Sequence, residues 1–492
     1  MTETAKKKRG MPSSFTILLA LLAIVAVITV IVSGTSGGAV TAARLSDFCT
    51  APIKGFADAL PVCLFVMILG GFLGMMTETG ALDNGIAVLV QKLKGNEIML
   101  IPVLMLIFSL GGTTYGMCEE TVPFYALLAA TMMAAGFDPM VGAATVLLGA
   151  GCGCLGSTVN PFAVGAAVDA LTGVDIAVNQ SIIIGLGAVL WLVTTVMSIV
   201  FVMSYAKKVK ADKGSTILSM QELKDAEEAH GKAASEVHKE VKLTGRQKGV
   251  LIAFAFTFVV MIVGFIPLAD LNEGVANFFD AGAVYDADGN AVVQGWSALI
   301  TGLPIGQWYF DEASTWFFLM AVLIGIIGGL SEKQIVNTFI TGAADMMSVV
   351  LVIALARGIS VLMANTGLDV YVLDAAANAL AGLSGVIFAP MSFLVYFGLS
   401  FLIPSTSGMA TVSMPIMGPL AVKLGFSPEV MVMIFSSAIG VVNLFTPTSG
   451  AIMGGLALAK IEWTTWLKFA LKLIVALSVV CAIILTVACV ML

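Results

Sequence analysis

The sequence predicts an all-α polytopic membrane protein made of two inverted-topology repeats, each with a re-entrant hairpin and a broken transmembrane helix. The first observation is composition: the 492-residue chain has a mean hydropathy of +1.02 and only 11% charged residues, whereas soluble domains average about 25%. The second is a series of apolar runs of about 20 residues, the length that crosses a bilayer. The third is that polar, glycine-rich stretches interrupt these runs at matching places in the two halves.

Residues 1–43 are predicted to form an N-terminal tail and the first transmembrane helix. A basic cluster at positions 6–9 precedes an apolar run from Phe15 to Val32, and basic residues favour the cytoplasmic side. No small-residue cleavage site follows the run, so we expect an uncleaved helix with a cytoplasmic N-terminus.

Residues 44–205 are predicted to form repeat 1. Its expected elements are an interfacial helix (44–57), a span (59–77), a re-entrant hairpin (98–134), a broken helix (139–168) and a further span (181–205). The hairpin tip, residues 112–119, is rich in glycine and hydroxyl side chains. Irregular backbone at that depth persists only inside protein or beside a water-filled cavity. We expect the broken helix to lose regular structure between Gly151 and Pro161.

The middle of the chain is predicted to connect the repeats. Residues 206–248 are hydrophilic and begin with several lysines, which indicates a cytoplasmic linker. Residues 249–330 should supply connecting helices around the segment 269–312, which is acidic and has no lysine or arginine. That composition favours the outer face of the membrane.

Residues 331–492 are predicted to form repeat 2, with a hairpin at 385–421 and a broken helix at 428–458. Its landmarks align with those of repeat 1: Phe108 with Phe397, and Asp58 with Asp345. An odd number of predicted crossings separates the two copies, so the first hairpin should enter from the cytoplasm and the second from outside. Inverted repeats of this kind are typical of secondary transporters, whose substrate site lies at mid-membrane.

The candidate site is expected where each hairpin tip faces a broken helix. Unwound backbone there leaves carbonyls and helix N-termini free, and hydroxyl and amide side chains donate and accept hydrogen bonds. The candidate substrate-binding residues are Thr113, Thr114, Tyr115, Gly116, Glu119, Glu120, Gly156, Ser157, Thr158, Asn160, Pro161, Arg357, Ser405, Thr406, Ser407, Gly408, Asn443, Thr446, Pro447, Thr448 and Ser449. The alternative is that the hydroxyl residues only stabilise kinks in ordinary spans.

Charged residues inside predicted spans are candidates for function, because charge at that depth is costly and usually functional. Glu119 and Glu120 could bind a cationic group, carry a proton, or pair with Arg357. A carboxylate and an arginine together would suit a zwitterionic ligand. Asp58 and Asp345 lie where spans begin, and we expect them to cap helices.

Other site classes are not supported by the sequence. The seven cysteines lack the spacing of a zinc or redox motif. There is no phosphate-binding glycine-rich loop with a lysine, no catalytic triad and no basic patch for nucleic acid. We therefore expect neither an enzyme nor a resident cofactor, and a metal site is left undecided.

Three stretches carry a resemblance to a known family. They are Gly111-Gly-Thr-Thr-Tyr-Gly-Met-Cys-Glu-Glu-Thr121, Gly153-Cys-Leu-Gly-Ser-Thr-Val-Asn-Pro161 and Leu402-Ile-Pro-Ser-Thr-Ser-Gly408. From about Met11 to the C-terminus the chain resembles the YfcC-type branch of the C4-dicarboxylate anaerobic carrier family, within the ion transporter superfamily. The resemblance implies scaffold and transport domains, elevator-like motion and often a homodimer. Similar members are assigned to basic amino acid exchange, including arginine for ornithine.

Three functional hypotheses follow. The first is an antiporter for arginine, ornithine or related cationic amino acids in a prokaryotic inner membrane, with Glu119 and Glu120 holding the cationic end and no coupling ion needed. The alternative is a sodium- or proton-coupled carrier of C4-dicarboxylates or other carboxylates, with Arg357 binding the anion and a possible sodium ion at the tips. The third is a membrane scaffold or receptor without transport, which gains nothing from buried polar tips. The expected partners are a small-molecule substrate, the lipid bilayer and a second copy of the chain.

Overall fold

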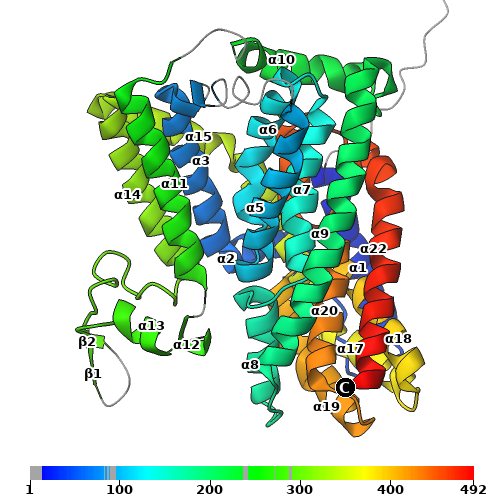
Figure 1. Cartoon of the computed structure of the whole chain (residues 1–492). Coiled ribbons are helices and arrows are strands. Elements are labelled where there is room, and N and C mark those ends of the chain that lie inside the picture. The colour runs from blue at the N-terminus through cyan, green and yellow to red at the C-terminus, as the bar shows by residue number, and fades with distance from the viewer. Residues whose placement is uncertain are drawn as a thin grey trace, which may run out of the picture.

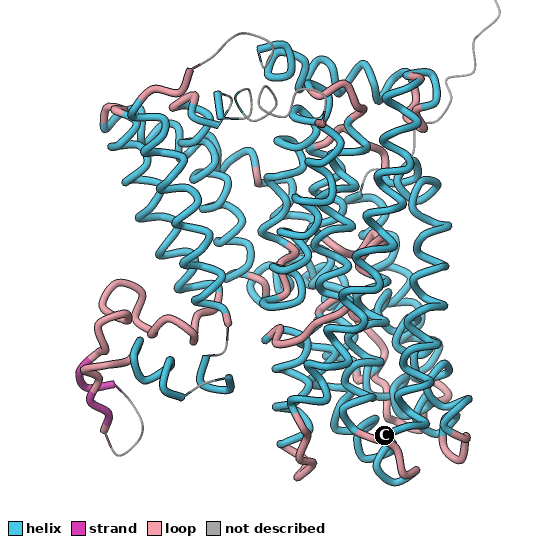
Figure 2. Tube along the Cα trace, viewed as in Figure 1, coloured by secondary structure: helices cyan, strands magenta, loops and turns pink. Residues whose placement is uncertain are grey.

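The computed structural model describes residues 14–82, 84–85, 88, 96–236, 242–266, 268–271, 273–286 and 291–492. Within these residues, nine helices are long and apolar enough to cross a membrane. The strands of this part of the chain are β1 (Val284–Tyr285) and β2 (Ala291–Val293), which pair antiparallel. Figure 2 shows helix throughout the bundle, with loop segments at its two ends and also within it. The predicted all-α polytopic membrane fold is confirmed.

The molecule has two distinct ends, and Figure 1 shows them at the top and bottom of the view. Helix α10 (Met220–Glu236) lies across one end, here called the linker face. Helices α12 (Leu268–Leu271) and α13 (Glu273–Phe279) lie with the strands at the other end, here called the loop face. The C-terminus lies toward the loop face. The basic linker and the acidic segment therefore lie on opposite sides, as the sequence predicts.

Repeat 1 follows helix α1 (Ser14–Ser33). Its elements are α2 (Leu45–Asp58), α3 (Leu60–Glu78), η1 (Glu97–Met99), α5 (Leu100–Tyr115), η2 (Glu119–Thr121), α6 (Val122–Ala134), α7 (Pro139–Leu155), η3 (Pro161–Gly165), α8 (Ala166–Thr172) and α9 (Gln180–Ala211). Between the repeats lie η4 (Lys213–Ser215), α10, α11 (Gly245–Phe265), the loop-face segment and α14 (Phe310–Gly328).

Repeat 2 has the same order of hairpin, half-helices and final span. They are α15 (Glu332–Asp345), α16 (Met347–Thr366), α17 (Leu368–Leu380), α18 (Gly385–Leu402), α19 (Thr406–Lys423), α20 (Pro428–Val442), α21 (Gly450–Leu458) and α22 (Trp463–Met491). Helices α7 and α20 pack against each other and are buried along almost their whole length. These two half-helices form the centre of the core.

The two broken helices begin in the same way. Asp138 caps α7 by accepting a hydrogen bond from the Val141 N–H (3.1 Å), and Ser427 caps α20 by accepting one from the Val430 N–H (3.4 Å). A proline follows each cap at the first helical position, where its missing N–H costs nothing. Short-range sequence signals therefore set the start of both helices.

The two hairpins enter from opposite faces (Figure 1). Helices α5 and α6 reach in from the linker face, and α18 and α19 reach in from the loop face. Each hairpin ends inside the bundle, beside the point where α7 or α20 stops. This is the inverted arrangement that the sequence repeat predicts.

A second pair of crossings follows the same inverted symmetry. Helix α2 crosses α16 where Gly55 meets Gly358, and α15 crosses α3 where Gly342 meets Gly70. A Cβ atom at Gly55 or Gly342 would collide with the backbone of the partner helix. Glycine at these positions lets the helices touch backbone to backbone, which fixes the ends of α2 and α15 relative to their neighbours.

Three details differ from the sequence expectation. Helix α7 continues to Leu155, because its glycines provide close packing and not a break: Gly153 lies against Gly112 of α5. Residues 112–115 are the last turn of α5, so the tip is shorter than expected. The acidic segment contains a short β-pair within an otherwise helical protein.

Candidate functional site

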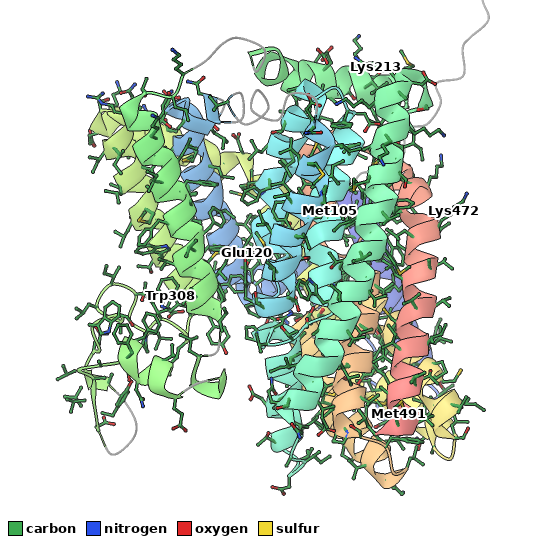
Figure 3. The ribbon with its side chains drawn as sticks, in the orientation of Figure 1. Met105, Glu120, Lys213, Trp308, Lys472 and Met491 are labelled. Carbon is green, nitrogen blue, oxygen red and sulfur yellow. The ribbon has the colours of Figure 1, made fainter. Side chains whose placement is uncertain are left out.

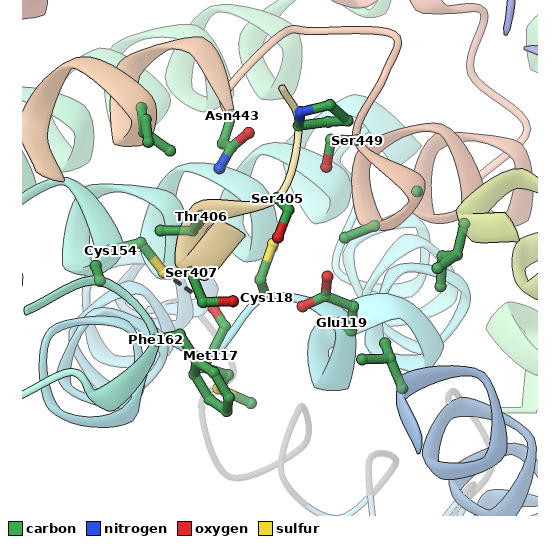
Figure 4. A pocket seen from close by; sticks show the side chains of 18 of the residues that line it. Met117, Cys118, Glu119, Cys154, Phe162, Ser405, Thr406, Ser407, Asn443 and Ser449 are labelled. Atoms are coloured by element: carbon green, nitrogen blue, oxygen red, sulfur yellow. Dashed lines mark hydrogen bonds between the residues drawn. The ribbon is translucent and has the colours of Figure 1, made fainter. Parts of the chain in front are cut away.

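A cavity of about 460 Å³ lies where the two hairpin tips and the two helix breaks meet α2, α8, α14 and α16. Its size is within the range of about 300–1,000 Å³ found for small-molecule sites. Figure 4 shows Glu119, Ser407, Asn443 and Ser449 around this space. Figure 3 places Glu120 between Lys213 at the linker face and Met491 toward the loop face, so the site is near mid-depth.

The first hairpin tip holds its two carboxylates differently. Gly116 ends α5 in the left-handed conformation (φ 78°), which glycine adopts without strain. Glu120 is 1% exposed, and its Oε2 accepts a hydrogen bond from the Cys118 N–H (2.9 Å). Glu119 is half-buried and lines the cavity, and within the described residues its carboxylate accepts no hydrogen bond from another residue. Glu119 is thus the carboxylate available to a ligand.

The first helix break is fixed by its own polar side chains. The Asn160 Oδ1 accepts hydrogen bonds from the N–H groups of Phe162 (2.9 Å) and Ala163 (3.3 Å). The Thr113 hydroxyl donates to the Gly156 carbonyl (2.6 Å), and the Thr158 N–H donates to the Thr113 carbonyl (2.8 Å). These bonds replace the lost helical ones and tie the break to the end of α5.

The second half uses a similar arrangement. Ser405 caps α19 by accepting from the Gly408 N–H (3.1 Å). The hydroxyls of Thr446 and Thr448 lie 2.7 Å apart behind the break after α20. The indole N–H of Trp463 donates to the Phe445 carbonyl (2.7 Å) and holds the same break from α22.

Several polar groups that line the cavity have no hydrogen-bond partner in the part of the chain described. Among them are the side chains of Ser407, Ser436, Asn443 and Ser449. Ser436 is also 2% exposed. Buried polar groups are normally satisfied, so the Ser436 hydroxyl is expected to bind a ligand or water. The other three side chains are half-buried and can bind either as well.

The one arginine that lines the cavity, Arg357, is paired. Its Nε lies 2.9 Å from Oδ2 of Asp58. The expected alternative of a pair with Glu119 or Glu120 is therefore wrong, because among the described residues the ion pair of Arg357 is with Asp58. The expectation that Asp58 caps a helix is also wrong: Asp58 is the last residue of α2, and its carboxylate faces the cavity.

The described ionisable groups of the cavity are predominantly acidic. Four carboxyl groups (Asp58, Glu119, Glu120 and Asp169) line it with the single guanidinium of Arg357. Asp58 already neutralises that guanidinium. Charges interact more strongly in a site shielded from bulk water, so the remaining carboxyl groups favour a cation.

The predicted site residues divide into two groups. Those that line the cavity are Gly116, Glu119, Glu120, Asn160, Pro161, Arg357, Ser405, Thr406, Ser407, Asn443, Thr448 and Ser449. Those that do not line it are Thr113, Thr114, Tyr115, Gly156, Ser157, Thr158, Gly408, Thr446 and Pro447. Several of the second group make hydrogen bonds that stabilise the tips and breaks. Substrate binding by the first group stays a prediction.

The aromatic side of the cavity is not apparent from the sequence. Phe162 lies directly after the first break and stacks on Phe310 of α14, with ring centroids 5.2 Å apart. The ring centroid of Tyr309 lies 6.2 Å from that of Phe162. No motif links these positions, because α14 is far from the break in sequence. Tyr309 and Asp169 are exposed on the loop side, whereas Tyr125, toward the linker face, is 2% exposed and packs on Gly455. The cavity therefore opens toward the loop face.

Comparison with known proteins gives a consistent match. The sequence profile of the DcuC family, described as C4-dicarboxylate anaerobic carrier, matches residues 38–490. An uncharacterised protein of Haemophilus influenzae is 28% identical over 445 residues, covering 90% of this chain and 78% of that protein. YfcC of Escherichia coli, whose name describes it as a candidate basic amino acid antiporter, is 27% identical over 440 residues, covering 87% of this chain and 77% of YfcC.

Two solved structures also align along the chain. MtrF of Neisseria gonorrhoeae, described with a class of antimetabolite efflux pumps, has a TM-score of 0.46 at 17% identity and covers 98% of this chain and 96% of its own. The YdaH transporter of Alcanivorax borkumensis has a TM-score of 0.47 at 16% identity and covers 96% and 97% of the two chains.

Proposed function

The chain belongs to the C4-dicarboxylate anaerobic carrier family, and from this premise we propose that it exchanges basic amino acids of the arginine and ornithine type. Membership makes it a secondary transporter in a membrane. The choice of substrate, the exchange mode and the motion are our proposal. The relative YfcC, whose name describes a candidate basic amino acid antiporter, supports that choice.

The observation that carries the proposal is the charge of the cavity. Its described acidic and basic side chains of the Asp, Glu, Lys, Arg and His types are four carboxyl groups and one guanidinium, and that guanidinium already has a carboxylate partner. An ammonium or guanidinium group would therefore enter a site whose positive charge is already compensated. An anionic substrate would be repelled by the remaining carboxylates. In our proposal, the half-buried Glu119 carboxylate binds the cationic end of the substrate.

The remaining groups suit the amino acid end. Ser407, Asn443 and Ser449 offer hydroxyl and amide groups without partners among the described residues. The N-termini of α19 and α21 carry free backbone N–H groups and a positive dipole end. Together they would hold the α-carboxylate and α-amino groups. We further propose elevator-like movement of the hairpins past α2 and α16, a homodimer, and a prokaryotic inner membrane with the N-terminus in the cytoplasm.

A second candidate keeps the chemistry of the family description. Arg357 lines the cavity, and a C4-dicarboxylate or another carboxylate could bind it, with a sodium ion or a proton as the coupling ion. In that case the anion would have to replace the Asp58 carboxylate at Arg357 and would be repelled by the nearby Glu119 carboxylate. This electrostatic cost makes the carrier of carboxylates the weaker proposal.

Counterflow in proteoliposomes separates the two. Vesicles loaded with ornithine receive labelled arginine or labelled succinate outside, each with and without sodium. We expect arginine uptake that depends on internal ornithine and does not change with sodium. Sodium-dependent succinate uptake, without arginine uptake, would overturn the proposal and support the carboxylate carrier.

A further inference from the structure

The ion pair between Asp58 and Arg357 does not follow from the repeat architecture. The α15–α3 crossing matches the α2–α16 crossing, and Asp345 ends α15 as Asp58 ends α2. The position of α3 that aligns with Arg357 is Gly70. Asp345 accordingly has no ion pair among the described residues and does not line the cavity. The aspartate is common to both repeats, but only in the cavity does it meet an arginine.

The guanidinium lies at a place suited to a ligand carboxylate. Its Nη1 would be 4.0 Å from a Cβ at Gly408, in the first turn of α19. The guanidinium and the N-terminal turn of an 18-residue helix thus approach the same part of the cavity. Both carry positive charge, and both offer N–H donors that can form hydrogen bonds with a carboxylate.

The exposure of the two partners differs. The Asp58 side chain is 51% exposed and the Arg357 side chain is 25% exposed. An ion pair that is half in water contributes little net free energy, because water screens it. Asp58 can therefore turn into the cavity water at small cost, while Arg357 stays fixed on α16.

We propose that Asp58 is a specificity-determining residue: it neutralises Arg357 in the empty cavity and gives up the guanidinium only to a carboxylate that arrives together with a cationic group for Glu119. The proposal rests on the proposed function, since it assigns the amino acid carboxylate to Arg357. A simple carboxylate brings no cation to compensate Glu119, so Asp58 excludes it. Without Asp58, the guanidinium would keep only the longer-range attraction of Glu119 and could pair directly with any carboxylate.

The test compares Asp58→Asn with the matched control Asp345→Asn in proteoliposomes. The readout is inhibition of labelled arginine uptake by external succinate, with the KM for arginine measured alongside. We expect succinate to inhibit Asp58→Asn at a concentration at least tenfold lower than wild type, and Asp345→Asn to match wild type. A folded Asp58→Asn protein that excludes succinate as wild type does would overturn the proposal.

Two further variants secure the interpretation. Asp58→Glu keeps the negative charge and should restore exclusion of succinate. Combining Asp58→Asn with Arg357→Gln should abolish the gained inhibition, and its persistence would show that succinate does not bind at Arg357. Size-exclusion elution and the melting temperature in detergent check folding, and Asp58→Ser replaces the asparagine variant if the latter does not fold.

Failure of the proposed function can be distinguished from failure of the role assigned to Asp58. If wild type does not take up arginine, direct binding of labelled succinate to purified wild type, Asp58→Asn and Asp345→Asn replaces the inhibition readout. A tenfold gain in succinate affinity for Asp58→Asn alone would then still support the role of Asp58, whereas no gain would reject it together with the substrate assignment.

Discussion

Glu119 and Glu120 are neighbours in sequence, yet their surroundings give them separate roles. Glu120 is 1% exposed and is fixed by the Cys118 N–H. Glu119 faces the cavity, and its carboxylate accepts no hydrogen bond from another described residue. A carboxylate that is anchored on backbone N–H groups orders the tip, whereas one that faces open space is ready for a ligand. The cationic end of the substrate should therefore depend chiefly on Glu119.

Glu119→Gln tests this assignment. A hydrogen bond to a charged group contributes about 1.5–3 kcal/mol, so we expect kcat/KM for arginine exchange to fall about ten- to hundredfold. The melting temperature should change little, because glutamine has nearly the same shape. Glu332→Gln, on the exposed first turn of α15, serves as the control and should transport normally. Full activity of Glu119→Gln would remove this carboxylate from the substrate site.

The sequence revealed these charges but not their partners. Glu119, Glu120 and Arg357 stand out because charge is rare inside apolar spans. The partner of Arg357 could not be predicted, since the contact with Asp58 depends on the glycine crossing of α2 and α16. The aromatic contacts of Phe162 were missed for the same reason. Residue types are visible in one dimension, but which of them meet is set by helix crossings.

Helix ends were predicted well where a local signal exists and poorly where packing decides. The caps Asp138 and Ser427, each followed by proline, mark α7 and α20 within the sequence. The glycines of α7 were interpreted as part of the break, but they allow close contact with α5. A glycine in an apolar helix is compatible with either reading until its neighbour is known.

The crossing of α5 and α7 gives a test at this scale. A Cβ at Gly112 would collide with the Ala150 carbonyl and approach Gly153, so Gly112→Ala should move the hairpin away from α7. Overpacking of this kind costs about 1–3 kcal/mol, and we expect a lower melting temperature and reduced transport. Gly185→Ala is the control, because a Cβ there meets nothing within 4 Å. Equal stability of the two variants would contradict the close crossing.

Helix α10 is held against the linker face by hydrogen bonds to the second repeat. The His230 Nε2 lies 3.1 Å from the Leu458 carbonyl at the end of α21, and Glu222 accepts a bond from the Glu462 N–H (2.9 Å) at the start of α22. Helix α10 also packs on α6. The linker thus joins the ends of elements from both repeats.

This contact should weaken in acid. Burial, together with the nearby Lys460, lowers the pKa of His230 below its usual value. The undocked helix therefore takes up a proton first, and docking is lost progressively as pH falls below about 6.5. After correction for the slower intrinsic amide exchange in acid, the protection factors of the α10 amides should be lower at pH 5.5 than at pH 7.5. His230→Gln should remove most of the difference, and an unchanged pH dependence in that variant would exclude His230 as the cause.

At the scale of the whole molecule, the two repeats share a backbone plan but not a charge plan. Glu119 and Glu120 align with Gly408 and Met409, and Arg357 aligns with Gly70. The symmetry provides two tips that enter from opposite faces, and the asymmetry provides one charged site between them. Inverted repeats allow the same contacts to form in two orientations, so the site can in principle be reached from either face.

The cavity in this structure opens toward the loop face, and this sidedness can be measured. In a background without the seven native cysteines, Ala166→Cys places a thiol on the cavity wall in α8. A membrane-impermeant maleimide should label it from the side that also labels Leu299→Cys, and not from the side that labels Lys213→Cys. Leu299 is 69% exposed on the loop side and Lys213 is exposed on the linker side, so the two controls define the faces.

Arginine should slow the labelling of Ala166→Cys but of neither control, because only Ala166 lines the proposed site. Labelling only from the Lys213 side in the absence of substrate would show that the resting protein opens the other way.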